Sequence, residues 1–348
     1  MEDSPTRILI IDTAWLGDVV FTTSLISSAR ALWPRAEIHM VVAPRGEPIL
    51  RGHPHLQRLW VLDKRGKHRN VIALAAFARQ LRMLDFDLIL NAHPSFRSRL
   101  LTKWIAAPIR VGFDGFGSRW CHTIHVPNDL AIEPDHVERR LNLLRRLGHS
   151  VKAAPLQVAV SPEELHEARQ FLEQHGITSL PLLGLVPGSA WPTKRWSVSR
   201  YGELASRWIS ERHGAVLTFG ASAETEILDQ LHGIHPERIL SMLNVPIPGV
   251  AAFLSVCSAV VGNDTGVSFL AMAAGCPRVV VLYGCTQVDY HFPPPHLAIT
   301  AGVPCCLPRT GHGAHRCRWG EEPWCMEQIT VERVWRELEP PAHNRQSS

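Results

Sequence analysis

The sequence predicts an α/β protein with two Rossmann-like domains, each built on a parallel sheet. Short, wholly apolar runs such as residues 8–11 and 182–186 indicate strands that are buried on both faces. These runs alternate with segments of helical periodicity, and the alternation starts a second time near residue 182. The length of 348 residues is too great for one ordinary core. It suits two domains of about 150 to 180 residues each, facing one cleft.

The expected elements follow one another in order along both halves. In the first half we expect strands at residues 7–11, 37–42, 58–62, 88–91 and 110–113, and helices at 19–33, 45–51, 70–84 and 135–147. Residues 148–163 carry glycine and proline without a long period, which is typical of a linker. In the second half we expect strands at 182–186, 215–219, 239–241, 259–261 and 278–283, and helices at 163–175, 199–211, 224–231, 249–257, 267–274 and 332–338.

Composition narrows the class of protein and its partners. Hydrophobic residues make up 45% and charged residues 20%, which is typical of a soluble globular chain. The net charge of +4 favours an anionic ligand or a membrane surface, but it is too small to indicate nucleic acid binding. No apolar run approaches the roughly 18 to 20 residues of a membrane span, and residues 1–7 do not resemble an export signal. We therefore expect a cytoplasmic protein without a transmembrane segment.

Residues 259–274 form the stretch that indicates an anion site. A β-branched strand runs into the small polar turn 262–266, and a helix with an apolar face follows it. Such a turn delivers free backbone N–H groups and the positive end of a helix dipole to a ligand, and glycine lets a phosphate approach. Asp264 stands where α/β folds place their ligands and should face sugar hydroxyls. The alternative is that Asp264 and Thr265 only cap the helix.

A second glycine-containing turn follows the first strand. Residues 12–18 join that strand to the helix expected from residue 19, and Asp18 stands at the helix start. Asp18 is either a helix cap or a general base that the helix dipole keeps ionised.

Two basic loops follow later strands of the first half. They span residues 63–69 and 93–99, and both leave the carboxyl end of an expected strand, so they should line the same rim as Asp18. A rim of cations suits a polyanionic acceptor, although ordinary solvated loops explain each residue singly. The cations in question are Lys64, Arg65, Arg69, Arg97 and Arg99.

Several other patterns argue against alternative chemistries. Neither a GxGxxG nor a Walker A motif follows a strand, so dinucleotide-binding and P-loop signatures are absent from the sequence. Asp85-Phe-Asp87 matches a short metal-binding pattern, but it lies where a helix turns into a strand, and such matches are common.

Eight cysteines divide into two groups. Four are scattered in apolar surroundings and suit a reducing compartment, namely Cys121, Cys257, Cys276 and Cys285. The other four lie close together with His312 and His315, namely Cys305, Cys306, Cys317 and Cys325. A zinc site, a disulfide and free thiols remain open for this group, and the adjacent Cys-Cys pair fits tetrahedral zinc poorly.

Three motifs in a fixed order resemble one family. They are Leu16-Gly-Asp-Val-Val after the strand Ile8-Leu-Ile-Ile, the loop Pro187-Gly-Ser with Lys194-Arg-Trp, and Asn263-Asp-Thr-Gly-Val-Ser with Ala-Ala-Gly-Cys-Pro. Together they look like the lipopolysaccharide heptosyltransferases of glycosyltransferase family 9. With Asp63-Lys-Arg-Gly between them, they look most like its heptosyltransferase II branch.

The resemblance implies a GT-B architecture and an inverting transfer that needs no metal and no cofactor. The implied donor is ADP-L-glycero-β-D-manno-heptose. The implied acceptor is the Kdo/heptose inner core on lipid A, at the cytoplasmic face of the inner membrane. The acceptor-binding domain would span residues 1–160 and the nucleotide-sugar-binding domain 161–328. A helix over 329–339 would pack back on the first domain, ahead of a disordered tail at 340–348.

Roles carry over by motif position. Asp18 would be the catalytic base, and Lys194 the cation on the donor pyrophosphate. The expected donor-binding residues are Gly17, Ser189, Thr193, Lys194, Glu224, Asp264, Thr265 and Gly266. The expected acceptor-binding residues are Lys64, Arg65, His93, Arg97 and Arg99. Without a metal, departing ADP needs fixed positive charge, which a lysine and a helix N-terminus supply.

The sequence departs from the family pattern at two places. Phe269 stands where relatives usually carry a histidine that could donate a hydrogen bond to a phosphate, and Ala190-Trp191 stands where relatives often carry hydroxyl residues. Two alternatives therefore stay open. One is a related GT-B transferase with another nucleotide sugar, and the other is a catalytically silent nucleotide-sugar-binding protein.

Overall fold

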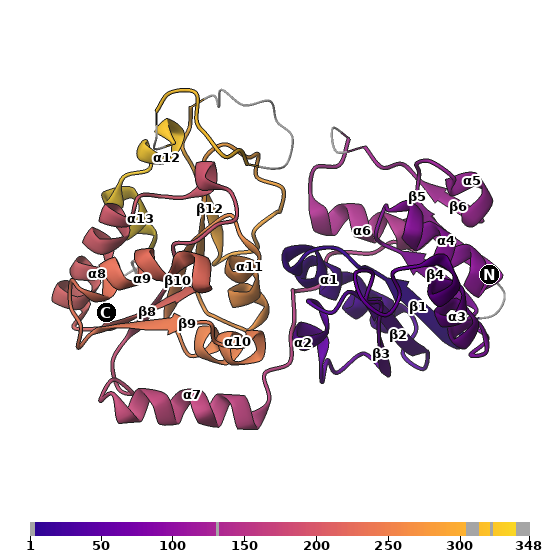
Figure 1. Ribbon diagram of the computed structural model, residues 1–348, viewed down its shortest axis with the longest axis horizontal. Helices are drawn as coiled ribbons and strands as arrows, with labels where there is room; N and C mark the ends of the chain where they lie inside the picture. The colour runs from indigo at the N-terminus through magenta and orange to yellow at the C-terminus, as the bar shows by residue number, and fades with distance from the viewer. Residues whose placement is uncertain (1–3, 130–131, 304–312, 321–322, 339–348) are drawn as a thin grey trace, which may run out of the picture. The chain divides into compact units, whose positions relative to one another are not determined.

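The computed structural model describes residues 4–129, 132–303, 313–320 and 323–338. The chain divides into two compact units, Met1–Ala159 and Val160–Ser348. Each unit is a parallel sheet covered by helices, as Figure 1 shows. In the described part of the chain, no helix is long and apolar enough to cross a bilayer.

The first unit contains a six-stranded parallel sheet in the order β3-β2-β1-β4-β5-β6. Its strands are β1 (Arg7–Ile11), β2 (Glu37–Val42), β3 (Arg58–Val61), β4 (Leu88–Asn91), β5 (Ile109–Phe113) and β6 (Ile124–Val126). Its helices are α1 (Leu16–Leu32), α2 (Glu47–Leu50), α3 (Val71–Arg82), α4 (Phe96–Ile105), α5 (Ser118–Cys121) and α6 (His136–Arg145).

The second unit repeats this strand order with its own six strands, as β12-β11-β10-β7-β8-β9. The strands are β7 (Leu182–Val186), β8 (Ala215–Gly220), β9 (Ile239–Leu243), β10 (Ala259–Asn263), β11 (Val279–Tyr283) and β12 (Leu297–Thr300). The helices are α7 (Pro162–Gln174), α8 (Val198–Arg212), α9 (Thr225–His232), α10 (Ile247–Ser255), α11 (Gly266–Ala273), α12 (Trp324–Glu327) and α13 (Val331–Leu338), with 3-10 turns η1 (Pro192–Lys194) and η2 (Ser222–Glu224).

The strand order fixes where ligands can bind in each unit. In both sheets the order reverses next to the first strand, between β1 and β4 in one unit and between β7 and β10 in the other. In open α/β sheets, the crevice outside the carboxyl ends of such neighbouring strands is the usual ligand site. The predicted α/β fold with two Rossmann-like domains is confirmed.

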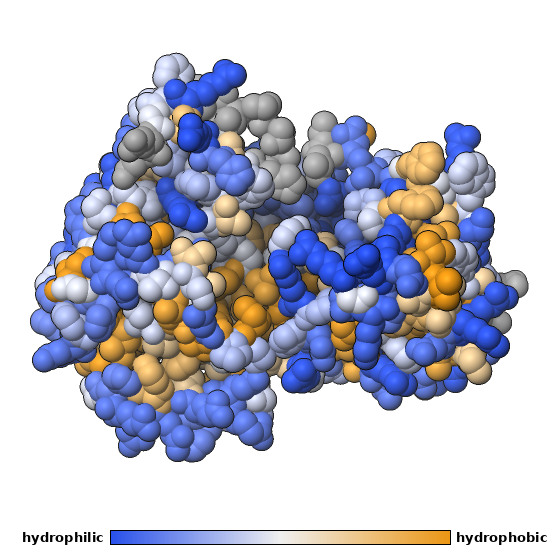
Figure 2. Space-filling model, viewed as in Figure 1, coloured by the Kyte–Doolittle hydropathy of each residue, from blue (hydrophilic) through white to orange (hydrophobic). Residues whose placement is uncertain are grey.

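Continuous apolar runs explain why the central strands form. Residues 8–11 of β1 are fully buried, and β1 pairs in register with Ile38 of β2 and Leu88 of β4 through Ile8. By contrast, α7 has a hydrophilic outer face, visible in Figure 2, and it packs on α10 through the rings of Phe171 and Phe253, 5.4 Å apart. Strands buried on both faces and helices buried on one give the three-layered units.

Several elements differ from the sequence predictions. The basic segment 93–99 is a loop only as far as Ser95, where α4 begins, because the Ser95 hydroxyl accepts the backbone N–H of Ser98 and caps the helix. The helix α1 begins at Leu16 instead of residue 19, which puts Asp18 in its first turn. The short strands β6 and β12 were not expected.

The helix α13 lies where the sequence predicts a helix, at Val331–Leu338. Its apolar face is buried in the core of the second unit, where the ring of Trp335 lies 6.2 Å from that of Trp208. Glu332 pairs with Arg207 of α8 at 2.7 Å. The second unit thus buries the apolar face of this helix, and the predicted packing of the helix on the first domain stays a prediction. The predicted tail at 340–348 lies outside the described residues.

Candidate active site

The first unit brings polar side chains together at the carboxyl ends of β1 and β4. Thr13 follows β1 and His93 follows β4, and the Thr13 hydroxyl lies 2.9 Å from His93 Nδ1. Burial lowers the pKa of His93, so the imidazole is neutral near pH 7. These strands flank the reversal of strand order, so this edge holds the candidate site of the first unit.

A buried arginine joins two carboxylates at this edge. Arg140 of α6 donates from Nη2 to Asp18 Oδ1 at 2.9 Å and to Asp12 Oδ2 at 3.3 Å. Its Nε donates to the Thr22 hydroxyl at 2.8 Å, and that hydroxyl donates to Asp12 Oδ2 at 2.6 Å. Asp12 is wholly buried and Arg140 nearly so. Charges this far from water persist only when they are paired and hydrogen-bonded.

Asp18 is held by this network and does not cap its helix. The N-cap of α1 is Trp15, which offers no side-chain hydrogen bond, while the Asp18 carboxylate points to Arg140. Burial raises the pKa of Asp18, but the charges of Arg140 and His136 and the hydrogen bond from Arg140 outweigh it. The pKa is therefore lowered, and Asp18 carries its negative charge throughout the neutral range.

One of the predicted acceptor-binding cations, Lys64, lies against the same cluster, and a second, Arg97, holds the loop that carries it. Lys64 Nζ donates to the Thr13 carbonyl at 3.3 Å, and burial lowers its pKa to about 8. Arg97 donates to the carbonyls of Lys64 at 3.2 Å and Arg69 at 2.7 Å, so it holds the basic loop onto α4. Arg65 is exposed on that loop.

Arg99 is placed differently. It is only 4% exposed, and it donates to the carbonyls of Asp114 at 2.9 Å and Phe116 at 3.2 Å. Its guanidinium therefore supports the loop after β5 and does not reach the rim where the sequence analysis expected it.

The second unit places a lysine and a carboxylate together at the ends of β7 and β10. Lys194 Nζ donates to Asp264 Oδ2 at 2.5 Å, and the Thr286 hydroxyl donates to the same oxygen at 2.9 Å. Burial raises the pKa of Asp264 and the charge of Asp289 adds to this, against the opposing attraction of Lys194. Lys194 and Asp264 thus form one buried pair, whereas the sequence analysis assigned them to different parts of the donor.

The helix α11 begins beside this pair without a side-chain cap. Its N-cap is Thr265, which makes no capping hydrogen bond, and Ser268 Oγ donates back to the Asn263 carbonyl at 2.7 Å. The alternative that Asp264 and Thr265 only cap this helix is therefore wrong. A helix start without a side-chain cap favours an anion, as expected for Gly266 and the turn before it.

Three predicted donor-binding side chains already have partners within the protein. The Thr193 hydroxyl donates to the Ala314 carbonyl at 2.9 Å and accepts the Ala314 N–H at 2.7 Å. Glu224 accepts the N–H of Ala221 at 2.9 Å, and Ser189 accepts that of Trp191 at 3.3 Å. These side chains shape the loops after β7 and β8, while Gly17 lies in the first turn of α1.

Two patterns from the sequence analysis remain, the Asp85-Phe-Asp87 pattern and the group of clustered cysteines. Asp87 accepts the backbone N–H groups of Thr6 at 2.7 Å and Arg7 at 2.9 Å, so it ties the start of β1 to that of β4. Cys317 and Cys325 are free thiols, and Cys305, Cys306 and His312 lie outside the described residues. Among the residues the structure describes, no three possible metal ligands lie together.

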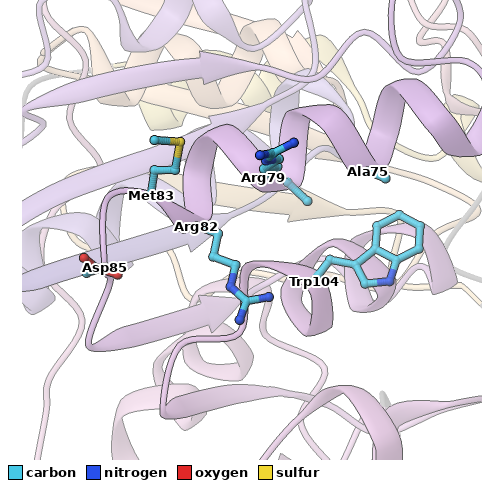
Figure 3. Close-up of a pocket in the computed structure, with 7 residues that line it drawn as sticks. Ala75, Arg79, Arg82, Met83, Asp85 and Trp104 are labelled. Atoms are coloured by element: carbon cyan, nitrogen blue, oxygen red, sulfur yellow. The ribbon is translucent and has the colours of Figure 1, made fainter.

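A hollow of about 590 Å³ lies elsewhere on the first unit (Figure 3). It is formed by the last turns of α3 and α4, at the edge of the sheet where the strands begin. Its lining residues are Ala75, Ala78, Arg79, Arg82, Met83, Asp85 and Trp104. The hollow is therefore separated by the length of the sheet from Asp12 and His93, and it is not part of the candidate site.

Comparison with known proteins decides the family. The model of glycosyltransferase family 9 (heptosyltransferase) matches residues 74–303, which is most of the chain. The chain belongs to glycosyltransferase family 9. As a family 9 member it is an enzyme that transfers a sugar, which confirms the expected class.

Relatives of this family 9 protein cover nearly its whole length. It is 26% identical over 347 residues to lipopolysaccharide heptosyltransferase 2 of Salmonella typhimurium, covering 95% of this chain and 97% of that one. The ADP-heptose lps heptosyltransferase II structure of E. coli matches with a TM-score of 0.76 and 24% identity, over 95% and 97% of the two chains. A family 9 structure from Veillonella parvula matches with a TM-score of 0.81 and 22% identity over 95% of each.

The family 9 protein contains one site feature that the sequence analysis did not single out. The network of Asp12, Thr22 and Arg140 surrounds Asp18, but only Asp18 was predicted. One signal was available, because Asp12 directly follows a buried strand at a carboxyl end. No comparable signal indicated Arg140, since an arginine on an amphipathic helix is normally exposed.

Phe269 fills an apolar site in this family 9 protein. It is 4% exposed, and its ring lies 6.2 Å from those of Tyr290 and Phe292. At this position the side chain contributes to packing behind the first turn of α11, and it offers no hydrogen bond to a phosphate.

Proposed function

We propose that this protein transfers heptose from ADP-L-glycero-β-D-manno-heptose to the Kdo/heptose inner core of lipopolysaccharide. Family 9 membership and the names of its relatives support this substrate pair. The observation that carries it within the structure is the Lys194 and Asp264 pair beside the uncapped start of α11. A fixed cation next to a helix N-terminus suits the diphosphate of a nucleotide sugar.

The first unit is assigned the acceptor and the second the donor. In this proposal the acceptor hydroxyl attacks the anomeric carbon on the face opposite ADP, its proton passes to Asp18, and ADP leaves with the electron pair of the broken bond. Asp18 is suited to this because its lowered pKa keeps it ionised and Arg140 fixes its orientation. A base of this kind contributes about 10²- to 10⁴-fold in rate.

Departing ADP needs positive charge, and the second unit supplies it without a metal. Lys194 and the first N–H groups of α11 would hold the diphosphate, and Asp264 would accept sugar hydroxyls once Lys194 turns to the phosphates. Lys64, Arg65 and Arg97 would meet the anionic groups of the acceptor. The proposed place of action is the cytoplasmic face of the inner membrane, where such an acceptor is presented.

The test is a transfer assay with defined acceptors. The protein is incubated with ADP-heptose and either Kdo-lipid A or its heptosylated form, and product mass and released ADP are measured with and without EDTA. A mass gain of one heptose that EDTA does not prevent, with inverted anomeric configuration by NMR, is expected. Dependence on added metal, or retention of configuration, would contradict the mechanism.

Two measurements distinguish the proposed function from its two alternatives, a GT-B transferase that uses another nucleotide sugar and a silent binding protein. Thermal shifts with ADP-heptose, UDP-sugars and GDP-sugars rank the donors, because stabilisation increases with the ratio of ligand concentration to Kd. Stronger stabilisation by a UDP- or GDP-sugar favours another transferase. Binding of ADP-heptose with no ADP release on either acceptor favours a silent binding protein.

A further inference from the structure

The exposed apolar side chains of the first unit gather at one edge of its sheet. Among its described residues, all the large exposed ones except Met83 lie between the carboxyl end of a strand and the first turn of the next helix, or on α5. They are Trp15, Val71, Ile72, Phe96, Phe116, Trp120 and Ile132. Single exposed apolar residues are ordinary, but a concentration beside a candidate site indicates an interaction surface.

Three of these residues form an aromatic cluster, defined here as Phe96, Phe116 and Trp120. Their exposed fractions are 50%, 78% and 70%. The rings of Phe96 and Phe116 are 5.6 Å apart, and a Cβ built on Gly117 would lie 3.2 Å from Phe96 and 4.0 Å from Trp120. Figure 2 shows apolar side chains over α4 with hydrophilic ones around them.

Cations lie next to this aromatic cluster. The basic loop, residues 63–69, carries Lys64, Arg65, Lys67 and Arg69. Arg97, which follows Phe96 in α4, donates to the carbonyls of Lys64 and Arg69 at 3.2 and 2.7 Å and so fixes the loop beside the first turn of α4. The surface therefore combines exposed aromatic rings with the positively charged Lys and Arg side chains of the basic loop.

We propose that the aromatic cluster and the basic loop dock the first unit onto an anionic lipid bilayer. Phe and Trp side chains favour the membrane interface, and Lys and Arg side chains are attracted to an anionic surface. The docked edge is the one that carries Asp18, so a lipid-linked acceptor reaches the base without leaving the bilayer. This last step rests on the proposed function, whereas the docking itself does not.

The test compares the full chain with two matched variants in sedimentation with vesicles. Vesicles of phosphatidylethanolamine and phosphatidylglycerol, free of any lipopolysaccharide, are set against vesicles of phosphatidylcholine alone. The double variant Phe116→Ser/Trp120→Ser should bind the anionic vesicles about tenfold or more weakly, since even partial burial of two such rings exceeds 1.4 kcal/mol. Met83→Ser is the control, because Met83 is equally exposed, at 77%, on the opposite edge of the same sheet.

Equal binding of the double variant and the full chain would overturn the proposal, and so would an equal loss in the control. A second copy of the chain could occupy this surface instead of a bilayer. Sedimentation of the chain without vesicles tests this, because it measures whether the chain is a monomer or a dimer. If the full chain is dimeric and the double variant monomeric, with no binding of vesicles by either, the surface joins two copies and the proposal is wrong.

A transfer assay separates this proposal from the proposed function. The double variant should match the full chain on a deacylated, water-soluble core acceptor and fall behind it on the same core embedded in vesicles. An equal deficit on both acceptors would contradict docking as the cause. If neither protein transfers heptose to any acceptor, the proposed function fails, while vesicle sedimentation still decides the docking surface.

Discussion

Arg140 provides the sharpest test of how the first unit prepares its carboxylate. Replacing it by methionine preserves much of the side-chain volume but removes the charge between Asp12 and Asp18. Asp12 is wholly buried, and among the described residues it would keep the hydrogen bonds from the Thr22 hydroxyl at 2.6 Å and the Ala14 N–H at 3.1 Å. Removing one partner of a buried ion pair costs about 3–5 kcal/mol, because the other charge stays buried and unpaired.

The same substitution should move the pH dependence of transfer. In the intact protein Arg140 favours the ionised form of Asp18 and lowers its pKa, against burial, which raises it. Without Arg140 the effect of burial dominates and the pKa rises. The acidic limb of kcat/KM against pH should therefore shift to higher pH. The part of the stability that depends on ionised Asp18, present above its unfolded pKa and lost as pH falls through the folded one, should disappear.

The assay is denaturant unfolding of the variant together with its pH–rate profile. Two controls separate charge from packing. Arg140→Lys keeps the charge but lacks the planar fork that reaches Asp12, Asp18 and Thr22 at once, so it should recover only part of the loss. Thr22→Val removes the bridging hydroxyl and leaves both ion pairs, so it should cost about 1–3 kcal/mol and leave the acidic limb unmoved. If Arg140→Met unfolds at the wild-type denaturant concentration and its acidic limb coincides with that of wild type, this reasoning is refuted.

Four further substitutions test other parts of the two clusters. Asp18→Ala should lower the transfer rate about 10²- to 10⁴-fold with ADP binding by calorimetry nearly intact, and normal turnover would refute its role as base. Lys194→Met should lower kcat about 10²- to 10³-fold and weaken ADP binding, which kinetics and calorimetry on one sample can check. The pKa of Lys64 is about 8, so the KM for the anionic acceptor should rise as pH increases through that value, and Lys64→Met should lose this dependence. Phe269→Ala should cost about 3–5 kcal/mol in thermal unfolding, because the ring is buried against two others, whereas a phosphate-contacting role would leave stability unchanged.

The strands could be predicted because strands buried on both faces consist of apolar residues throughout. Residues 279–283 are apolar throughout and β11 is buried throughout, and the same holds for β7. The start of α4 was not predicted, because the charged residues Arg97 and Arg99 suggested a solvated loop. The cap at Ser95, with Leu101 and Ile105 buried four residues apart, was the signal that decided the outcome.

Partners distant in sequence were the least predictable feature. The pattern of α13 shows that one face must be buried, but it does not say which domain buries it, and Trp208 settles that only in three dimensions. Arg140 lies 122 residues from Asp18 in the chain, and the sequence around either residue does not indicate that the two form an ion pair. Reasoning from the single sequence thus located the sheet edges where these polar clusters lie, but not the distant residues that pair with Asp18.

The two clusters treat their carboxylates in opposite ways, and this has a chemical consequence. Asp18 has a lowered pKa because the charge of the buried Arg140 guanidinium and its hydrogen bond, with the charge of His136, outweigh the effect of burial, so it stays charged. Asp264 has a raised pKa because burial and the charge of Asp289 outweigh the attraction of Lys194. A diphosphate that binds Lys194 would replace Asp264 as the partner of the lysine, and the Thr286 hydroxyl would still donate to the Asp264 carboxylate. Groups whose environments drive their pKa values apart are typical of divided roles, which agrees with the proposal that Asp18 acts as the base and that Lys194 and Asp264 hold the donor.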